Sequence, residues 1–249
     1  MVTLDLTHGS APATAGQRVW RQALFDLGNA LRNGENLLLT LVIPIGVLIL
    51  TLKSPLSGDR TAGQALVGAA SLAVLATAFT SQAIGTGFDR RYGVLRMLGL
   101  SPLGARGLLL ARTLVSLLII AVQTTILTLL TWWLSGWFPS DPAQILQALA
   151  AVLLAVWAFT AWALLIAGTL RAEATLAVAN AVFLVLMFAG GLAIPAQDLP
   201  WATVAGWLPT GALVAAMSSA APAWGPLAVL VVWAVAGTGL ATRYFRWES

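Results

Sequence analysis

Long blocks of uncharged, apolar residues, separated by short polar joints, constrain this sequence more than any other feature. Between Ala62 and Phe88, for example, no residue carries a charge. A helix needs about 20 apolar residues to cross the roughly 30 Å hydrocarbon core of a membrane. Charged residues make up only 9% of the chain, whereas soluble domains contain about 25%. The blocks therefore predict an all-α membrane protein rather than a soluble fold.

Six blocks predict six transmembrane helices. The first contains Pro44, which a membrane helix tolerates as a kink. The uncharged stretch from Asp198 to Arg243 is too long for one crossing, and its first half is crowded with prolines, which break helices. We expect an outer re-entrant helical hairpin at 199–222, between spans five and six. The expected spans are 36–52, 62–88, 107–134, 143–169, 174–194 and 224–242.

The N-terminal segment divides into a polar tail and an amphipathic helix. Residues 1–15 are polar and small, which predicts a disordered tail before a single transmembrane domain at 16–249. Within 16–34, Trp20, Leu24, Leu27 and Leu31 fall on one helical face, and arginines lie on the others. This pattern is typical of a helix in the membrane interface. A soluble helix packed on a partner is the alternative.

The distribution of basic residues predicts the orientation. With six spans, Lys53 and Arg60 are the only basic residues on one side of the membrane, out of 13 lysines and arginines. Cytoplasmic loops carry the excess of positive charge. Both termini are therefore expected in the cytoplasm.

The joint between the second and third expected spans, residues 89–102, carries more charged residues than any other joint. Val94, Met97 and Leu98 follow helical spacing and form an apolar ridge beside arginines. Such a short helix can dock in a groove of a soluble partner or rest on anionic lipid, and composition alone favours neither. The candidate coupling residues are Asp89, Arg90, Arg91, Gly93, Val94, Arg96, Met97 and Leu98.

The sequence contains no recognisable catalytic set. It has no Gly-x-x-x-x-Gly-Lys-Ser/Thr loop for nucleotide phosphates, no cysteine, and one histidine, His8, in the polar tail. The arginines are scattered among joints and form no continuous face for nucleic acid. We expect no enzymatic activity, metal, cofactor or nucleic-acid partner for this chain alone.

Three polar residues inside the expected spans are candidates for a translocation path. Gln82, Gln123 and Asn180 can provide weak hydrogen bonds to a passing cargo. Such residues also join neighbouring helices, where each hydrogen bond contributes about 0.6 kcal/mol. Both interpretations stay open.

The chain resembles the ABC-2 type permeases of ATP-binding cassette exporters, particularly bacterial drug-export permeases of the daunorubicin-resistance kind. The resemblance covers nearly the whole chain. In the joint, Gly93-Val94-Leu95-Arg96 replaces the family's common Gly-Thr-Leu-Glu, so an arginine stands where an acid is usual. The matching segments are Arg32-Asn33-Gly34-Glu35 before Leu37–Pro44, Asp89-Arg90-Arg91-Tyr92-Gly93 through Leu98 to Ser101-Pro102, Gly191-Leu192-Ala193-Ile194-Pro195, and Trp207-Leu208-Pro209.

The resemblance implies a transport subunit in the inner membrane of a bacterial cell. Separate ABC ATPase subunits, holding ATP and Mg²⁺, would dock on residues 89–102. A second permease subunit, identical or related, would complete the path for a hydrophobic or amphipathic cargo, such as a drug in multidrug efflux and antibiotic resistance, or a lipid. Three alternatives remain: a haem or cytochrome-biogenesis exporter of the same architecture, an ion-coupled secondary transporter, and a non-transporting membrane anchor.

Overall fold

The computed structural model describes residues 13–32, 34–53, 60–192 and 200–246, and every regular element in these ranges is a helix. The long helix at Ala62–Arg91 is interrupted by a π-helical turn, which is called the π segment below. The elements are α1 (Ala15–Arg32), α2 (Gly34–Lys53), α3 (Ala62–Val74), the π segment (Leu75–Ser81), α4 (Gln82–Arg91), α5 (Val94–Gly99), α6 (Gly104–Ser135), α7 (Pro142–Thr169), α8 (Ala172–Ala189), α9 (Ala202–Ala205), α10 (Pro209–Ser218) and α11 (Trp224–Tyr244).

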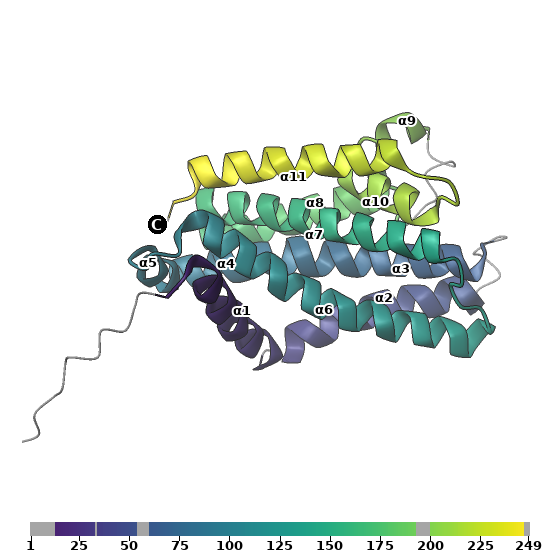
Figure 1. Cartoon of the computed structure of the whole chain (residues 1–249), viewed down its shortest axis with the longest axis horizontal. Coiled ribbons are helices and arrows are strands. Elements are labelled where there is room, and N and C mark those ends of the chain that lie inside the picture. Colours follow the sequence, from purple (N-terminus) through teal and green to yellow (C-terminus); the bar gives the residue numbers. More distant parts are fainter. Residues whose placement is uncertain (1–12, 33, 54–59, 193–199, 247–249) are drawn as a thin grey trace, which may run out of the picture.

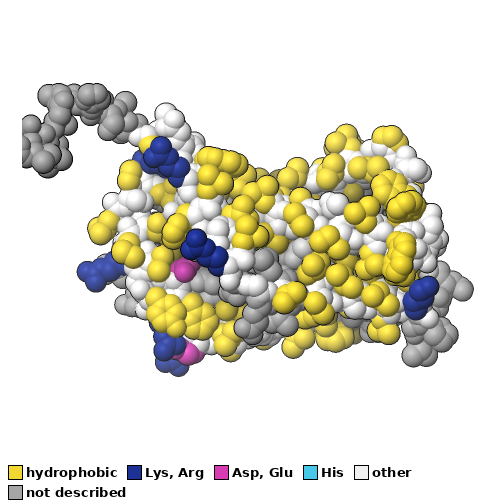
Figure 2. Space-filling view, turned by 90° about the horizontal axis from the view of Figure 1, so that it is seen from below, with side chains coloured by type: hydrophobic (Ala, Val, Ile, Leu, Met, Phe, Trp, Pro, Cys, Tyr) yellow, Lys and Arg dark blue, Asp and Glu magenta, His cyan; other side chains and the backbone are white. Residues whose placement is uncertain are grey.

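The long helices lie side by side and form one elongated bundle (Figure 1). The short helix α5 lies at one end with α1 and the C-terminal end of α11, while α9 and α10 lie at the other end. A band of apolar side chains covers the middle of the surface seen in Figure 2, and the charged side chains gather toward the two ends. This distribution suits a protein whose middle lies in hydrocarbon.

Within the described residues, five helical rods are long and apolar enough to cross a membrane. The prediction had six spans, and the first of them along the chain, at 36–52, is not confirmed. Helix α2 has 20 residues, but only its Thr40–Lys53 part is counted as apolar helix, and this part is shorter than a span. The five rods are Ala62–Arg91, Gly104–Ser135, Pro142–Thr169, Ala172–Ala189 and Trp224–Tyr244.

Local sequence signals set several helix ends close to the expected boundaries. Thr61 and Gln64 form a capping box that begins α3. The Asp141 side chain accepts a hydrogen bond from the Ala143 amide, and Pro142 occupies the first turn of α7. Gly136, with φ of 70°, ends α6 in the left-handed conformation. The rod formed by α8 ends at Ala189, whereas the prediction placed the end of this span, the fifth of the expected six, at 194, which lies outside the described residues.

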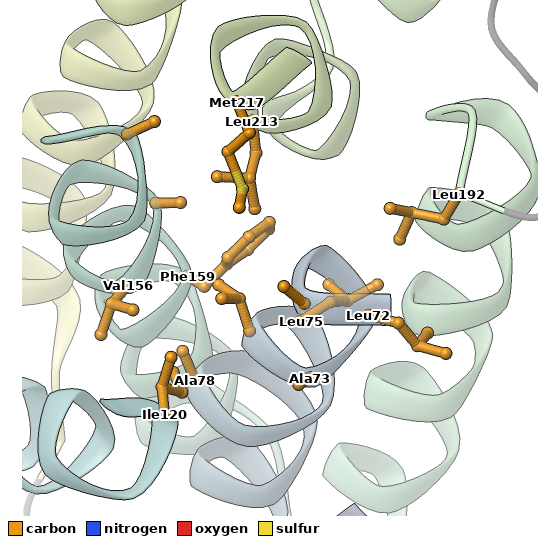
Figure 3. Close-up of a cluster of buried hydrophobic side chains, with 14 of the residues drawn as sticks. Leu72, Ala73, Leu75, Ala78, Ile120, Val156, Phe159, Leu192, Leu213 and Met217 are labelled. Atoms are coloured by element: carbon orange, nitrogen blue, oxygen red, sulfur yellow. The ribbon is translucent and has the colours of Figure 1, made fainter. Parts of the chain in front are cut away.

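The core lies where α7 meets the π segment, α10 and α11. The Phe159 ring of α7 is buried between the π segment and α10 (Figure 3). Against α11, the Trp162 indole donates a hydrogen bond to the Trp233 carbonyl at 3.0 Å. A Cβ at Gly237 would lie 2.8 Å from the Trp162 ring, so this glycine permits the close approach of α11 to α7.

Helix α1 packs along α6 with a face next to the expected apolar one. Val19, Ala23 and Leu27 meet Ala111 and Val115 of α6. Three of the four residues of the expected apolar face stay exposed and are free to contact lipid: Trp20, Leu24 and Leu31. The expected tail, 1–15, falls mostly outside the described residues, and α1 begins at Ala15.

The region expected to form a hairpin contains α9 and α10, both at the end of the bundle opposite α5 (Figure 1). Helix α10 buries Ala212, Leu213 and Ala216 in the core. The Gln147 side chain of α7 donates to the Ala216 carbonyl at 2.8 Å, and its oxygen accepts from the Ala223 amide at 2.9 Å. These bonds tie both ends of the loop before α11 to α7.

Candidate coupling surface

The joint between α4 and α6 folds as a sharp turn followed by the six-residue helix α5. Gly93 makes the turn with φ of 79°, a left-handed conformation that costs a residue with a side chain about 1–2 kcal/mol. After α5, the Ser101 hydroxyl donates to the Leu98 carbonyl at 2.6 Å. The Arg18 guanidinium of α1 donates to the Pro102 carbonyl, also at 2.6 Å. The joint is thereby attached to α1.

Helix α5 is amphipathic, but its faces differ from the prediction. Leu95 is fully buried, and Leu98 packs beside it against Leu108, Leu109 and Leu164 of α6 and α7. The expected ridge of Val94, Met97 and Leu98 is therefore divided, with Leu98 on the inner side.

The outer side of the joint is apolar and accessible. Met97 is 66% exposed and Leu100 is 87% exposed, and the Tyr92 ring, at the end of α4 just before the Gly93 turn, is exposed as well. Arg96 also lies on this outer side. We call Tyr92, Met97 and Leu100 the outer apolar patch. Apolar side chains held outward on a rigid turn are typical of a surface that a partner covers.

Two of the joint's arginines bind within the chain. The Arg90 guanidinium donates to the Leu170 carbonyl at 3.1 Å, at the end of α7, where a cation is favoured by the helix dipole. Arg91 pairs with Glu173 in the first turn of α8. These contacts attach the joint to α7 and α8, so Arg90 and Arg91 act as anchors in this structure.

Asp89 belongs to an ion-pair network that joins three helices. Arg112 of α6 lies between two carboxylates, with its Nε 3.2 Å from Asp26 of α1 and its Nη2 2.5 Å from Asp89 of α4. The side chains of Arg112 and Asp26 are only 12% and 4% exposed. Arg112 therefore links α1 and α4 to α6.

The Asp26 carboxyl is the most deeply buried charge of this network. Burial raises its pKa above the ordinary value of 3.8, because the charged form loses hydration. The attraction of Arg112 and a hydrogen bond from Gln22 at 2.9 Å offset part of this effect, whereas the charge of Asp89 adds to it.

The three polar residues expected along a path do not meet in one cavity. The Gln82 amide donates to the Ser116 hydroxyl at 3.0 Å. The Gln123 side chain bridges helices, accepting from Thr77 at 3.0 Å and donating to Thr40 at 3.2 Å. Gln82 lines a small polar cavity of about 190 Å³ that Gln123 and Asn180 do not line. In this conformation Gln82 and Gln123 join helices.

Asn180 differs from the two glutamines because it lies on the outside of the bundle. It is exposed halfway along α8, and its amide has no hydrogen-bond partner among the described residues. An amide in hydrocarbon is costly unless another group binds it. Its side chain is therefore accessible to groups outside this chain.

Sequence reasoning missed Leu95, Asp26 and Arg112. Two signals were available: Asp26 is the only acid in α1, and Arg112 lies two turns inside an apolar block, where a charge needs a partner. Among the described residues, no cluster of histidines or acids with metal-binding geometry occurs.

Span-length apolar helices with an anchored, charged joint at one end define a multi-pass membrane protein. The model of the ABC-2 type transporter family matches residues 17–220, and the chain belongs to that family. No curated protein matches the chain. The family assigns the chain to the membrane component of a transporter, which associates with ABC ATPases.

Proposed function

We propose that this chain is the permease subunit of an ATP-driven exporter, with the joint at 89–102 as the surface that receives the ATPase. Separate ATPase subunits would hold ATP and Mg²⁺. The observation that carries this proposal is the outer apolar patch, because its residues are exposed while the rest of the joint is anchored to α1, α6, α7 and α8. A push on the patch would reach four helices at once.

The proposed cargo is a hydrophobic or amphipathic molecule, such as a drug or a lipid, moved out of the cytoplasm or the inner leaflet. Support comes from the apolar surfaces of the rods, in which charged groups are confined to positions near the ends. Export of this kind underlies multidrug efflux and antibiotic resistance.

The proposed topology has six spans, with α2 as the first, and both termini in the cytoplasm of a bacterial cell. The clustering of arginines near α1 and α5 supports this orientation. The hairpin of α9 and α10 would then enter the membrane from the outside without crossing it.

The Met97→Asp variant tests the docking role. A carboxylate at this position would have to be buried without a partner in an apolar groove, a costly placement. We expect the variant to lose the co-purifying ATPase and the transport-linked stimulation of ATP hydrolysis, while its thermal stability stays unchanged because Met97 is exposed.

Tyr244→Asp is the matched control, since Tyr244 is an exposed aromatic at the same end of the bundle but outside the joint. Normal ATPase binding and turnover in Met97→Asp would refute docking at the outer patch. Leu98→Asp is a poorer probe, because Leu98 packs inward and its loss would disturb the fold.

A further inference from the structure

Two adjoining cavities on the flank of the bundle have complementary chemistry. The larger, of about 830 Å³, is a groove lined by α3, α6 and α7. The smaller, of about 470 Å³, lies between the start of α1 and the start of α6. Trp20 and Leu114 line both, so the two cavities meet at these side chains.

The larger groove is long and has an apolar lining. Along α6 it extends from Leu114 to Thr128, about 21 Å at 1.5 Å per residue. One leaflet of hydrocarbon is about 15 Å thick, so the groove is long enough for an acyl chain. Its other walls include Val67, Ala148 and Val152, and none of the described residues that line it is charged.

The smaller cavity has a mostly apolar lining, and its charged side chains are basic. Arg18 and Arg106 line it, and no acidic side chain of the described residues does. The Arg18 Nε–H is buried and has no hydrogen-bond acceptor, although Nη1 donates to Pro102. The first residues of α1, Ala15 and Gly16, also line the cavity, and the start of a helix carries partial positive charge. Two arginines that line one cavity suit a phosphate.

We propose that these cavities form one binding site for an anionic phospholipid, with the phosphate against Arg18 and Arg106 and one acyl chain in the groove between α6 and α7. Charge complementarity selects an anionic head group over a zwitterionic one, and the connection at Trp20 and Leu114 places head group and chain in one molecule. Trp20 suits this junction, because indole rings prefer the boundary between head groups and hydrocarbon. The bound lipid would attach α1 and the joint to the spans, whatever the cargo is.

Lipid retention by the purified full-length protein tests the head-group half of the site. Dioleoyl phosphatidylglycerol and dioleoyl phosphatidylcholine are added in detergent, and native mass spectrometry counts the retained lipids. We expect one phosphatidylglycerol to be retained preferentially. Because each basic residue near a membrane contributes to binding anionic lipid, Arg18→Gln with Arg106→Gln should lower this affinity about 30-fold. Arg21→Gln with Arg243→Gln removes the same charge from exposed positions outside both cavities and should leave retention unchanged.

Filling the groove tests the acyl-chain half. Ala121 is exposed into the groove, so Ala121→Phe should block the chain and abolish selective retention. Ala236→Phe, on the exposed side of α11, is the control. Equal retention of the two lipids, or equal behaviour of the two arginine pairs, would overturn the proposal. Displacement of the lipid by millimolar inorganic phosphate together with no effect of Ala121→Phe would also overturn it, because the site would then bind only a free anion.

Discussion

At the scale of single residues, Arg112 links α1 and α4 to the rest of the bundle. Among the described residues, it is the only basic partner of the buried Asp26 carboxyl. It also pairs with Asp89. Removing one member of a buried ion pair leaves an uncompensated charge, which is more costly than the pair itself is favourable. In Arg112 variants, two carboxylates would remain close together.

We expect Arg112→Met to lower the free energy of unfolding by about 3 kcal/mol, measured by thermal unfolding in detergent. Arg21→Met, on the exposed side of α1, should change it little. A loss no larger than that of Arg21→Met would mean that the network contributes no net stability.

The residue scale also marks a limit of prediction from sequence. The apolar spacing of Trp20, Leu24, Leu27 and Leu31 correctly predicts a helix, but not which side meets α6. That side contains Asp26, whose partner Arg112 is 86 positions away in the sequence. Hydropathy shows whether a block is apolar, but it gives no information on such long-range pairs.

At the scale of elements, α5 shows why a short amphipathic helix is difficult to orient from its sequence. In Val94–Gly99, apolar residues occupy several sides of one and a half turns, so more than one ridge can be drawn. The structure selects Leu95 and Leu98 as the inner side because the ends of α6 and α7 leave space there. The long rods, by contrast, follow the expected blocks closely, since a membrane span is defined by length and hydrophobicity alone.

The turn before α5 gives a prediction at this scale. Gly93→Ala should cost about 1 kcal/mol of stability, because alanine is strained at a φ of 79°. Gly85→Ala, at an exposed helical position with open space, should instead gain about as much through helix propensity. Thermal unfolding of both variants distinguishes the two effects, and equal shifts would contradict the role given to Gly93.

At the scale of the whole molecule, opposite ends of the bundle should face opposite sides of the membrane. The chain has no cysteine, so single introduced cysteines report topology directly. We expect Ala220→Cys, after α10, to react with an impermeant maleimide in intact cells. Leu100→Cys, at the joint, should react only in inverted vesicles. Labelling of Ala220→Cys from the cytoplasm alone would exclude the proposed hairpin and the six-span topology.

The second permease subunit gives another prediction at this scale. Asn180 lies exposed on α8 and has no hydrogen-bond partner in the part of the chain that the structure describes, whereas the other two candidate path residues, Gln82 and Gln123, are buried. We expect Asn180→Cys to cross-link to a second permease subunit in membranes. Val232→Cys, equally exposed on α11, is the control and should react with lipid-soluble reagents only. Equal cross-linking from both positions would exclude α8 as the specific subunit contact.

Because of the π segment, the Ala62–Arg91 rod should tolerate some kinds of mutation better than others. An inserted residue shifts every later residue by about 100° around the helix axis relative to an uninterrupted α-helix. This offset lets the π segment place Phe79 and Thr77 in the core while Gln82 still reaches Ser116 and Asp89 reaches Arg112. A conservative substitution within 75–81 leaves this rotational offset unchanged. Deletion of one residue there would rotate α4, the part of the rod after the π segment, away from α6. Insertions and deletions in this turn should therefore be far more damaging than exchanges of side chains.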